Sequence, residues 1–390
     1  MAQFSLRSLF MGTLAAFVGF ASSFAVILQG LVTVGASTAQ AASGLMALCL
    51  AMGLAAIVLS TRTRLPISVA WSTPGGALLA GTVVEGGFGV AVGAFIGCAV
   101  MLMLSGLIPW LGRLVARLPV CLASAMLAGI LFRLCTAPAI AMAEVPLVGV
   151  LLIAAWAIGG FINRLLAVPA ALFVFVVYTL MSFDLSSLAW EKVDWFPWVW
   201  ITPEFTLQGL ISIAVPLFIV TTASQNIPGA AVLQSNGYVT PMGPLVATTG
   251  LFSLLSAPFG GHAVNLAAIT AALCAGEESH PDPTRRYWSA IVAGVWYIII
   301  GVSAGAVTLF VSLAPAIVLQ AVAGLALMGS FAAASVAAFT TTQYREAAAI
   351  TFFIAASGVS FGGISGAFWG LLAGVLVYTL IRWREQQASD

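Results

Sequence analysis

Basic residues recur along this chain at intervals that fit a protein crossing a membrane many times. Cytoplasmic loops of membrane proteins carry an excess of Lys and Arg. When the chain is divided into fourteen crossings, almost all its basic residues fall at the two ends or directly after an even-numbered crossing. These residues are Arg7, Arg62, Arg64, Arg113, Arg117, Arg164, Arg285, Arg286, Arg345, Arg382 and Arg384. Arg133 falls within a predicted crossing and Lys192 on the opposite side, so the pattern predicts cytoplasmic N- and C-termini.

Composition also predicts a membrane protein. The 390 residues are 62% hydrophobic and 6% charged, whereas soluble domains are roughly a quarter charged. A net charge of +1 argues against a nucleic-acid partner, because such proteins present a basic face. The first apolar run, residues 8–30, is too long for a cleaved signal peptide. The five cysteines lie in apolar stretches without C-x-x-C spacing, so neither a metal nor a cofactor is expected.

Charged residues mark the loops between the predicted crossings. The first seven crossings lie in residues 8–61 (two, broken at 30–40), 65–84, 86–112, 118–143, 145–163 and 165–183. The last seven lie in residues 205–276 (three), 287–344 (two) and 347–381 (two). The predicted fold class is therefore an all-α polytopic membrane protein in contact with lipid.

Residues 184–206 are predicted to link two halves of the chain outside the membrane. Trp190, Trp195, Trp198 and Trp200 lie there, and tryptophan prefers the bilayer interface, so an anchor is favoured over a binding site. The halves, 1–183 and 207–390, each hold an odd number of crossings and insert with opposite orientations. This is the inverted repeat common in secondary transporters.

The third and tenth crossings do not have the pattern of continuous helices. In the third, the β-prone segment 65–71 precedes a helix start at 72–76, with Pro74 in the first turn. In the tenth, residues 257–264 are extended or irregular, and a helix resumes around Asn265. Irregular backbone at membrane depth is tolerated only when it is buried in protein or lines a cavity. The alternative is that the Gly and Pro residues here only relieve helix packing.

Two such half-helices predict an anion site. Helix N-termini carry unpaired N–H groups and a partial positive charge, and both are expected to face one hollow near the middle of the bilayer. Gly75, Gly76, Gly260 and Gly261 would let a ligand approach the backbone closely. An anion suits such a place.

Polar residues in the eighth and first crossings are expected to face the same hollow. The run Ser224, Gln225, Asn226 is costly in lipid unless it is satisfied internally. Ser22 is its counterpart in the first half, with the alternative that it only permits close helix contact.

Two ionisable residues fall within the predicted crossings. His262 is a candidate proton carrier because its pKa lies near neutrality, and a neutral histidine lining the pocket is an equal alternative. Arg133 either binds a carboxylate or extends outward toward Glu144, and the second reading is favoured. Lys192 is the only lysine, which excludes a phosphate loop and an intramembrane Schiff base. A transporter is therefore favoured over an enzyme.

Several segments resemble the benzoate/proton symporter family (BenE) of bacterial inner membranes. The matching segments are 71–75 (WSTPG), 223–229 (ASQNIPG), 259–272 (FGGHAVNLAAITAA), 280–283 (HPDP) and 365–370 (SGAFWG). The resemblance covers essentially the whole chain. It implies the fold of nucleobase permeases and sulfate-type anion transporters, with a core domain of spans 1–4 and 8–11 and a gate domain of spans 5–7 and 12–14. It also implies uptake of benzoate with a proton.

The nucleobase permeases resemble this chain in architecture but place acids in spans eight and ten. Here those positions hold Ser224, Gln225, His262 and Asn265. An acid would repel a carboxylate, so the difference agrees with an aromatic acid anion as substrate. The aromatic ring is expected to lie against Phe24, Phe259 and Trp71. The expected substrate-binding residues are Thr73, Gly75, Gly76, Ser224, Gln225, Asn226, Gly261, His262, Asn265 and Ser22.

Two other functions remain open from the sequence. One is a carrier of the same fold for a nucleobase or an inorganic anion, and the other is an anion channel or uniporter. Gate-domain dimers in related folds make a homodimer a further expectation, by analogy alone.

Overall fold

The computed structural model describes residues 5–82, 84–108, 110, 119–182, 194–267, 269–362 and 364–389. Within these ranges, nine helices are long and apolar enough to cross a bilayer, or ten if the bent pair Pro283–Val302 and Ala304–Ser312 forms one span. The prediction of a mostly helical, polytopic membrane protein is confirmed. Long helices alone do not yield fourteen crossings.

Within the described residues, the first half contains five of the long apolar helices and several shorter ones. Its helices are α1 (Leu6–Ala21), α2 (Phe24–Thr33), α3 (Thr38–Thr63), α4 (Thr73–Ala80), α5 (Phe88–Leu107), α7 (Val120–Cys135), α8 (Ala137–Glu144), α9 (Pro146–Ile162) and α10 (Ala167–Ser182). The predicted break at 30–40 falls between α2 and α3. Ser37 and Gln40 form a capping box there, which satisfies two N–H groups at the start of α3.

The second half begins with an eighth span that changes helix type twice. It consists of α11 (Leu207–Gly209), the π-helical turn η4 (Leu210–Ala214), α12 (Val215–Thr221), the π-helical turn η5 (Thr222–Asn226) and α13 (Ile227–Ser235). The later helices are α14 (Met242–Ser256), α15 (Ile269–Ala275), α16 (Tyr287–Val302), α17 (Ala304–Ser312), α18 (Ala316–Phe339), α19 (Arg345–Ser357) and α20 (Gly366–Ser389). A short hairpin, β3 (Ser360–Phe361) and β4 (Ile364–Ser365), joins the last two.

The third and tenth crossings each combine a strand with a short helix, as predicted. Strand β1 (Val69–Trp71) precedes α4, and β2 (Val264–Leu266) precedes α15. The strands pair antiparallel, with Ala70 opposite Asn265, which supplies backbone partners away from water. The expectation that a helix resumes around Asn265 is wrong, because Asn265 belongs to the strand and α15 begins at Ile269.

The antiparallel pairing separates the two helix starts. Ser72 N–H donates to Ala263 O at 2.9 Å where α4 begins, and Ala267 N–H donates to Ser68 O at 3.0 Å just before α15. The two helices therefore leave from opposite ends of the strand pair, and α15 has only seven residues. This arrangement decides which of the two starts can border a given cavity.

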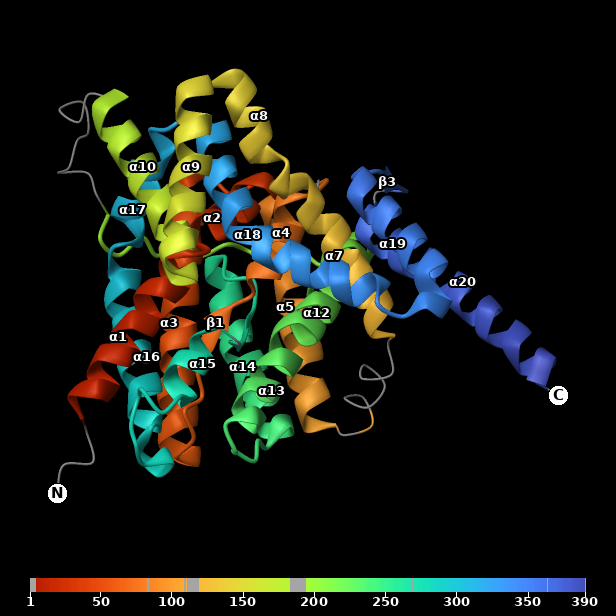
Figure 1. The fold of residues 1–390 in the computed structure, drawn as a ribbon. Coiled ribbons are helices and arrows are strands. Elements are labelled where there is room, and N and C mark those ends of the chain that lie inside the picture. The colour runs from red at the N-terminus through yellow and green to blue at the C-terminus, as the bar shows by residue number, and fades with distance from the viewer. Residues whose placement is uncertain are drawn as a thin grey trace.

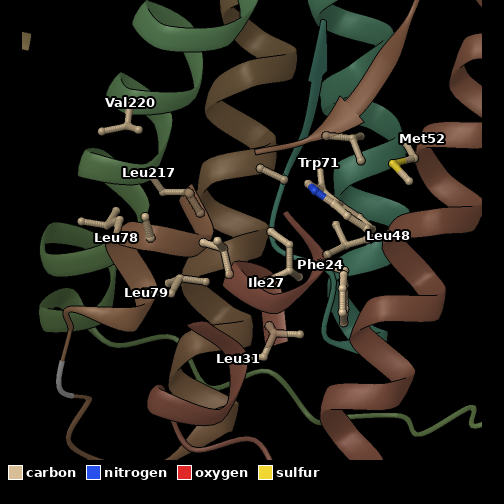
Figure 2. Close-up of a cluster of buried hydrophobic side chains, with 14 of the residues drawn as sticks. Phe24, Ile27, Leu31, Leu48, Met52, Trp71, Leu78, Leu79, Leu217 and Val220 are labelled. Carbon is tan, nitrogen blue, oxygen red and sulfur yellow. The ribbon is translucent and has the colours of Figure 1, made fainter. Parts of the chain in front are cut away.

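Buried apolar side chains hold α4 in place. Figure 2 shows Ile27 and Leu31 of α2, Leu78 and Leu79 of α4, and Leu217 of α12 pointing toward one another. Close fitting of apolar side chains is the main source of helix association in membranes. The half-helix α4 is therefore fixed to its neighbours.

Two aromatic residues expected to contact a substrate ring belong to this buried cluster (Figure 2). Phe24 is 4% exposed and Trp71 is 2% exposed. The Trp71 indole N–H donates to Ser23 Oγ at 2.8 Å. Because their surroundings are protein, the expectation that they contact a ring is not met in this structure.

The described part of the linker, residues 194–206, packs against both halves of the chain. Val199 N–H donates to Ser43 Oγ at 3.1 Å, and Glu204 N–H donates to Gly89 O at 2.9 Å. Phe259, the third residue expected at the substrate ring, packs edge-on against Trp198 and Trp200. The predicted anchor residue Trp190 lies outside the described residues.

Helices α7 and α18 lie side by side, and α19 and α20 extend beyond them to the C-terminus (Figure 1). On the other side of the molecule, α3 packs against α16 and α5 packs against α14. The eighth span, with its two π-helical turns, lies between these groups and contacts both α5 and α7.

Candidate functional site

A cavity of about 450 Å³ opens between the eighth span and the α7–α18 pair. Its volume lies within the range of small-molecule sites, about 300–1,000 Å³. The first wall is formed by Pro74, Ile219, Thr222, Ala223, Ser224, Gln225, Ile227 and Pro228. The second wall is formed by Val120, Ala123, Ser124, Leu127, Ser330, Ala333, Ala334 and Ala337. Both walls are mostly apolar with a few polar groups, as in sites for small amphiphilic molecules.

The polar side chains of the cavity have no protein partner. In the described part of the chain, no hydrogen bond involves the side chains of Thr222, Ser224, Gln225, Ser124 or Ser330. Serine and threonine elsewhere in these helices commonly donate to a carbonyl three or four residues earlier. The unused hydrogen-bonding groups of Ser224, Gln225, Ser124 and Ser330 are therefore available to a ligand or water, whereas the Thr222 hydroxyl is buried.

The π-helical turn η5 explains how one short segment serves two faces. Ile227 N–H donates to Thr222 O, so the turn holds an extra residue. Asn226 consequently points into the protein, where its Oδ1 accepts from Leu266 N–H at 2.9 Å, while Ser224 and Gln225 line the cavity. Single π-helical turns occur frequently at functional sites.

A proline follows each π-helical turn. Proline lacks an N–H and its ring clashes with the carbonyl four residues earlier. For Pro216 that carbonyl is Ser212 O, which accepts from Ser365 Oγ at 2.9 Å. For Pro228 it is the carbonyl of Ser224, a residue that lines the cavity. The prolines thus account for both turns.

The start of α4 borders the cavity through Pro74, but most of its donors are used. Gly75 N–H donates to Ser72 Oγ at 3.1 Å, Gly76 N–H donates to Ser72 O at 2.8 Å, and Pro74 has no N–H. Thr73 is the first-turn residue whose N–H remains for a ligand. The positive end of the α4 dipole still points toward this edge.

None of the residues 269–275 of α15 lines this cavity, and residue 268, directly before α15, lies outside the described residues, so a hollow shared by both helix starts stays a prediction. The antiparallel strand pair places the α15 start at its far end, beside Ser68. Among the described residues, the start of α4 borders the site through Pro74.

His262 connects β2 to the start of α4. It is fully buried, its Nδ1 accepts from Ala263 N–H at 2.7 Å, and its Nε2 lies 3.1 Å from Ser72 O. Nε2 must therefore donate, because a carbonyl only accepts. The ring is a neutral imidazole with both nitrogens engaged, and it does not line the cavity.

Asn265 has a similar position. In the amide orientation that satisfies both of its atoms, Nδ2 donates to Leu266 O at 2.9 Å and Oδ1 accepts from Ser72 N–H at 3.0 Å. The side chain is fully buried. Like His262, it holds the strand pair and the α4 start together.

The glycines at the broken crossings provide room for protein. A Cβ at Gly75 would overlap Leu217, and one at Gly76 would lie 2.8 Å from Ile27 Cδ1. A Cβ at Gly261 would lie 2.5 Å from a serine oxygen. Neighbouring side chains occupy the space on the Cβ side of these glycines, and close approach of a ligand to their backbone stays a prediction.

Of the predicted site residues, Ser224 and Gln225 line the cavity, and Thr73 and Asn226 are adjacent to lining residues. Ser22 donates to Gly19 O at 3.2 Å and does not line it. The sequence prediction missed Thr222 and Pro228, although a proline within the eighth span indicates an irregular helical turn just before it. It also missed Ser124 and Ser330, because nothing in the sequence indicates that these helices face the eighth span.

Arg133 is exposed and lies at the end of α19, and its two expected roles both stay predictions. Its guanidinium lies against Gly358, the residue that ends α19. In the described part of the chain the one ion pair joins Arg285 to Asp282, so Arg133 is not paired with Glu144. The negative end of the α19 dipole favours a cation at this position.

Known structures with this fold include two anion transporters. The transmembrane domain of the cyanobacterial bicarbonate transporter BicA matches with a TM-score of 0.57 and 15% identity, over 95% of this chain and 97% of that one. The murine Slc26a9 anion transporter, in an inward-facing state, matches with a TM-score of 0.61 and 11% identity, over 99% of this chain and 69% of that one. At such identities the likeness establishes the fold alone.

Sequence comparison establishes the family. The inner membrane protein YdcO of Escherichia coli is 38% identical over 375 residues, 96% of this chain and 95% of that protein. The benzoate membrane transport protein of Acinetobacter baylyi is 32% identical over 382 residues, 97% of this chain and 96% of that protein. The model of the BenE family, described as benzoate membrane transport protein, matches residues 2–380. This membrane transporter, which is not an enzyme, therefore belongs to the benzoate membrane transport protein (BenE) family.

Proposed function

We propose that the protein takes up benzoate or a similar aromatic carboxylate together with a proton, by alternating access at the cavity described above. The observation that carries this proposal is the cavity itself. Its walls are mostly apolar, and its five polar lining side chains make no hydrogen bond to the part of the chain that the structure describes. An apolar ring with one anionic group matches that combination.

The carboxylate is proposed to bind at the first wall. Ser224 and Gln225 offer neutral donors there, and Thr73 N–H stands at the positive end of α4. None of the described residues that line the cavity is acidic, so an anion meets no like charge from them. The ring would lie against apolar side chains such as Ile219 and Leu127.

We propose further that the chain forms fourteen crossings in a 7+7 inverted repeat. Support comes from the ten spans counted with the bent pair, to which β1–α4, β2–α15 and the shorter helices α9 and α19 add four. The packing is also paired as a two-fold axis requires: α3 with α16 and α5 with α14, and α9 with α10 and α19 with α20. The core and gate domains expected from the resemblance would then supply the first and second walls.

The carboxylate itself, rather than His262, is proposed to carry the proton. Support comes from the two hydrogen bonds of His262 and its position behind the cavity wall. A histidine that gained a proton would have to give up Ala263 N–H as a donor. This route leaves the strand pair undisturbed during transport.

The protein is proposed to lie in a bacterial inner membrane with both termini in the cytoplasm. The name of the Escherichia coli relative and the arginine pattern support this placement. A homodimer remains an expectation from analogy with related folds.

Counterflow with purified protein in liposomes tests the function. Labelled benzoate should enter vesicles preloaded with unlabelled benzoate, and a pH gradient alone should drive its accumulation. Competition by uracil or sulfate without competition by benzoate would assign a different substrate. Exchange without pH-driven accumulation would indicate a uniporter or channel.

A further inference from the structure

The second wall of the cavity carries two hydroxyls of its own. Ser124 on α7 and Ser330 on α18 line the cavity, and neither makes a hydrogen bond within the described part of the chain. Ser105 and Ser312, on other helices of this protein, donate to the carbonyl three residues earlier at 2.8 Å and 2.7 Å. The two cavity serines do not close that local bond.

The surroundings of these serines leave room for a substituent. Their neighbours along the wall are mostly alanines: Ala123, Ala333, Ala334 and Ala337. They lie on α7 and α18, whereas Ser224 and Gln225 lie on η5 of the eighth span. A ligand whose carboxylate is bound at the first wall would direct the far side of its ring toward Ser124 and Ser330.

Their chemistry favours a neutral polar group. Ser330 lies in the middle of α18 (Ala316–Phe339), away from the helix ends, and Ser124 lies in the second turn of α7 (Val120–Cys135), beyond the first turn in which the dipole acts most strongly. A serine hydroxyl both donates and accepts, and so does a phenolic hydroxyl. A ring hydroxyl therefore matches this wall better than a second anionic group would.

We propose that Ser124 and Ser330 form a subsite for a ring hydroxyl, so that the transporter accepts 3- or 4-hydroxybenzoate as well as benzoate. This inference rests on the proposed function, because it assumes that the carboxylate binds at the first wall. 2-Hydroxybenzoate differs from the other two acids. Its hydroxyl lies beside its own carboxylate and bonds to it, which keeps it away from Ser124 and Ser330.

Competition binding to purified protein tests the subsite. Inhibition constants of benzoate and the three hydroxybenzoates against labelled benzoate would be measured for wild type, Ser124→Ala and Ser330→Ala. Alanine favours helices, so both variants should fold. Ser105→Ala is the matched control, since Ser105 is bonded to its own helix.

In at least one serine variant, the affinity for 3- or 4-hydroxybenzoate should fall about fivefold relative to the affinity for benzoate, which is the effect of one lost hydrogen bond. The affinities of the serine variants for benzoate and 2-hydroxybenzoate should change less than twofold. All affinities of the Ser105→Ala control should also change less than twofold. An unchanged ratio of hydroxybenzoate to benzoate affinity in both serine variants would overturn the subsite.

Direct binding of labelled 4-hydroxybenzoate separates this inference from the proposed function. Wild type that binds it through the serines but does not bind benzoate would support the subsite and refute benzoate as substrate. Wild type that binds benzoate with no dependence on either serine would refute the subsite alone. Binding of neither acid would refute both proposals.

Discussion

Replacing His262 with alanine tests whether this residue is a structural bridge or a proton carrier. The loss of the bond to Ser72 O costs about 0.5–1.5 kcal/mol, and an unsatisfied Ala263 N–H costs about 1–3 kcal/mol. The side chain is fully buried, so a cavity adds to the cost, and the total should reach about 3–5 kcal/mol. His262→Gln keeps a donor near Ser72 O and should cost about 1–2 kcal/mol.

Two measurements check this prediction. Thermal unfolding in detergent should give the stability order wild type, His262→Gln, His262→Ala. Proteoliposomes containing folded His262→Gln should still accumulate benzoate when a pH gradient is applied. His280→Ala is the control, because the His280 side chain accepts one N–H, that of Asp282 in the same loop, at 3.0 Å.

The opposite pattern would refute the reasoning. If His262→Gln were as stable as wild type and exchanged benzoate but ignored the pH gradient, the histidine would carry the proton. The hydrogen bonds of the resting ring would then have to break in each transport cycle.

Three further perturbations test the fold. Gly358→Ala should destabilise the fold by about 1–3 kcal/mol and so lower the melting temperature, because Gly358 has φ +66° and the added Cβ would displace Arg133. An unchanged melting temperature would contradict this packing. Ser37→Ala should cost about 1 kcal/mol by removing the capping box of α3, measured by the same unfolding assay, and a neutral effect would count against the cap. Hydrogen bonds from Thr284 hold the pKa of the Asp282 carboxyl below its ordinary value of 3.8. The ionised carboxyl should therefore stabilise the fold above that pH, and this stabilisation should be lost as the pH falls through the lower folded pKa. Asp282→Asn should remove this loss of melting temperature at acid pH, and an identical pH profile in the variant would contradict the prediction.

The spans and broken crossings could be predicted because they depend on local patterns. Long apolar runs mark the spans, and the arginines between them mark the loops. Pro74, which follows a β-prone segment, marks the change from strand to helix at α4. The tenth crossing was placed less well. The sequence around Asn265 does not indicate that this residue pairs with Ala70 in a strand ladder. Because of that pairing, α15 begins only at Ile269.

The cavity was only partly predictable because it is a tertiary feature. Ser224 and Gln225 were identifiable as polar residues in an apolar span. Predicting that His262 faces the protein interior requires knowledge of its partner Ser72, which lies 190 residues away in sequence. Ser124 and Ser330 required knowledge of how α7 and α18 pack against the eighth span.

A structure with 4-bromobenzoate bound would test the proposed site most directly, because the anomalous signal of bromine locates the ligand without ambiguity. The account predicts a single bromine peak between the two walls, near Ser124 and Ser330, with the carboxylate at Ser224 and Gln225. A bromine peak behind the first wall, beside His262 and Trp71, would contradict it.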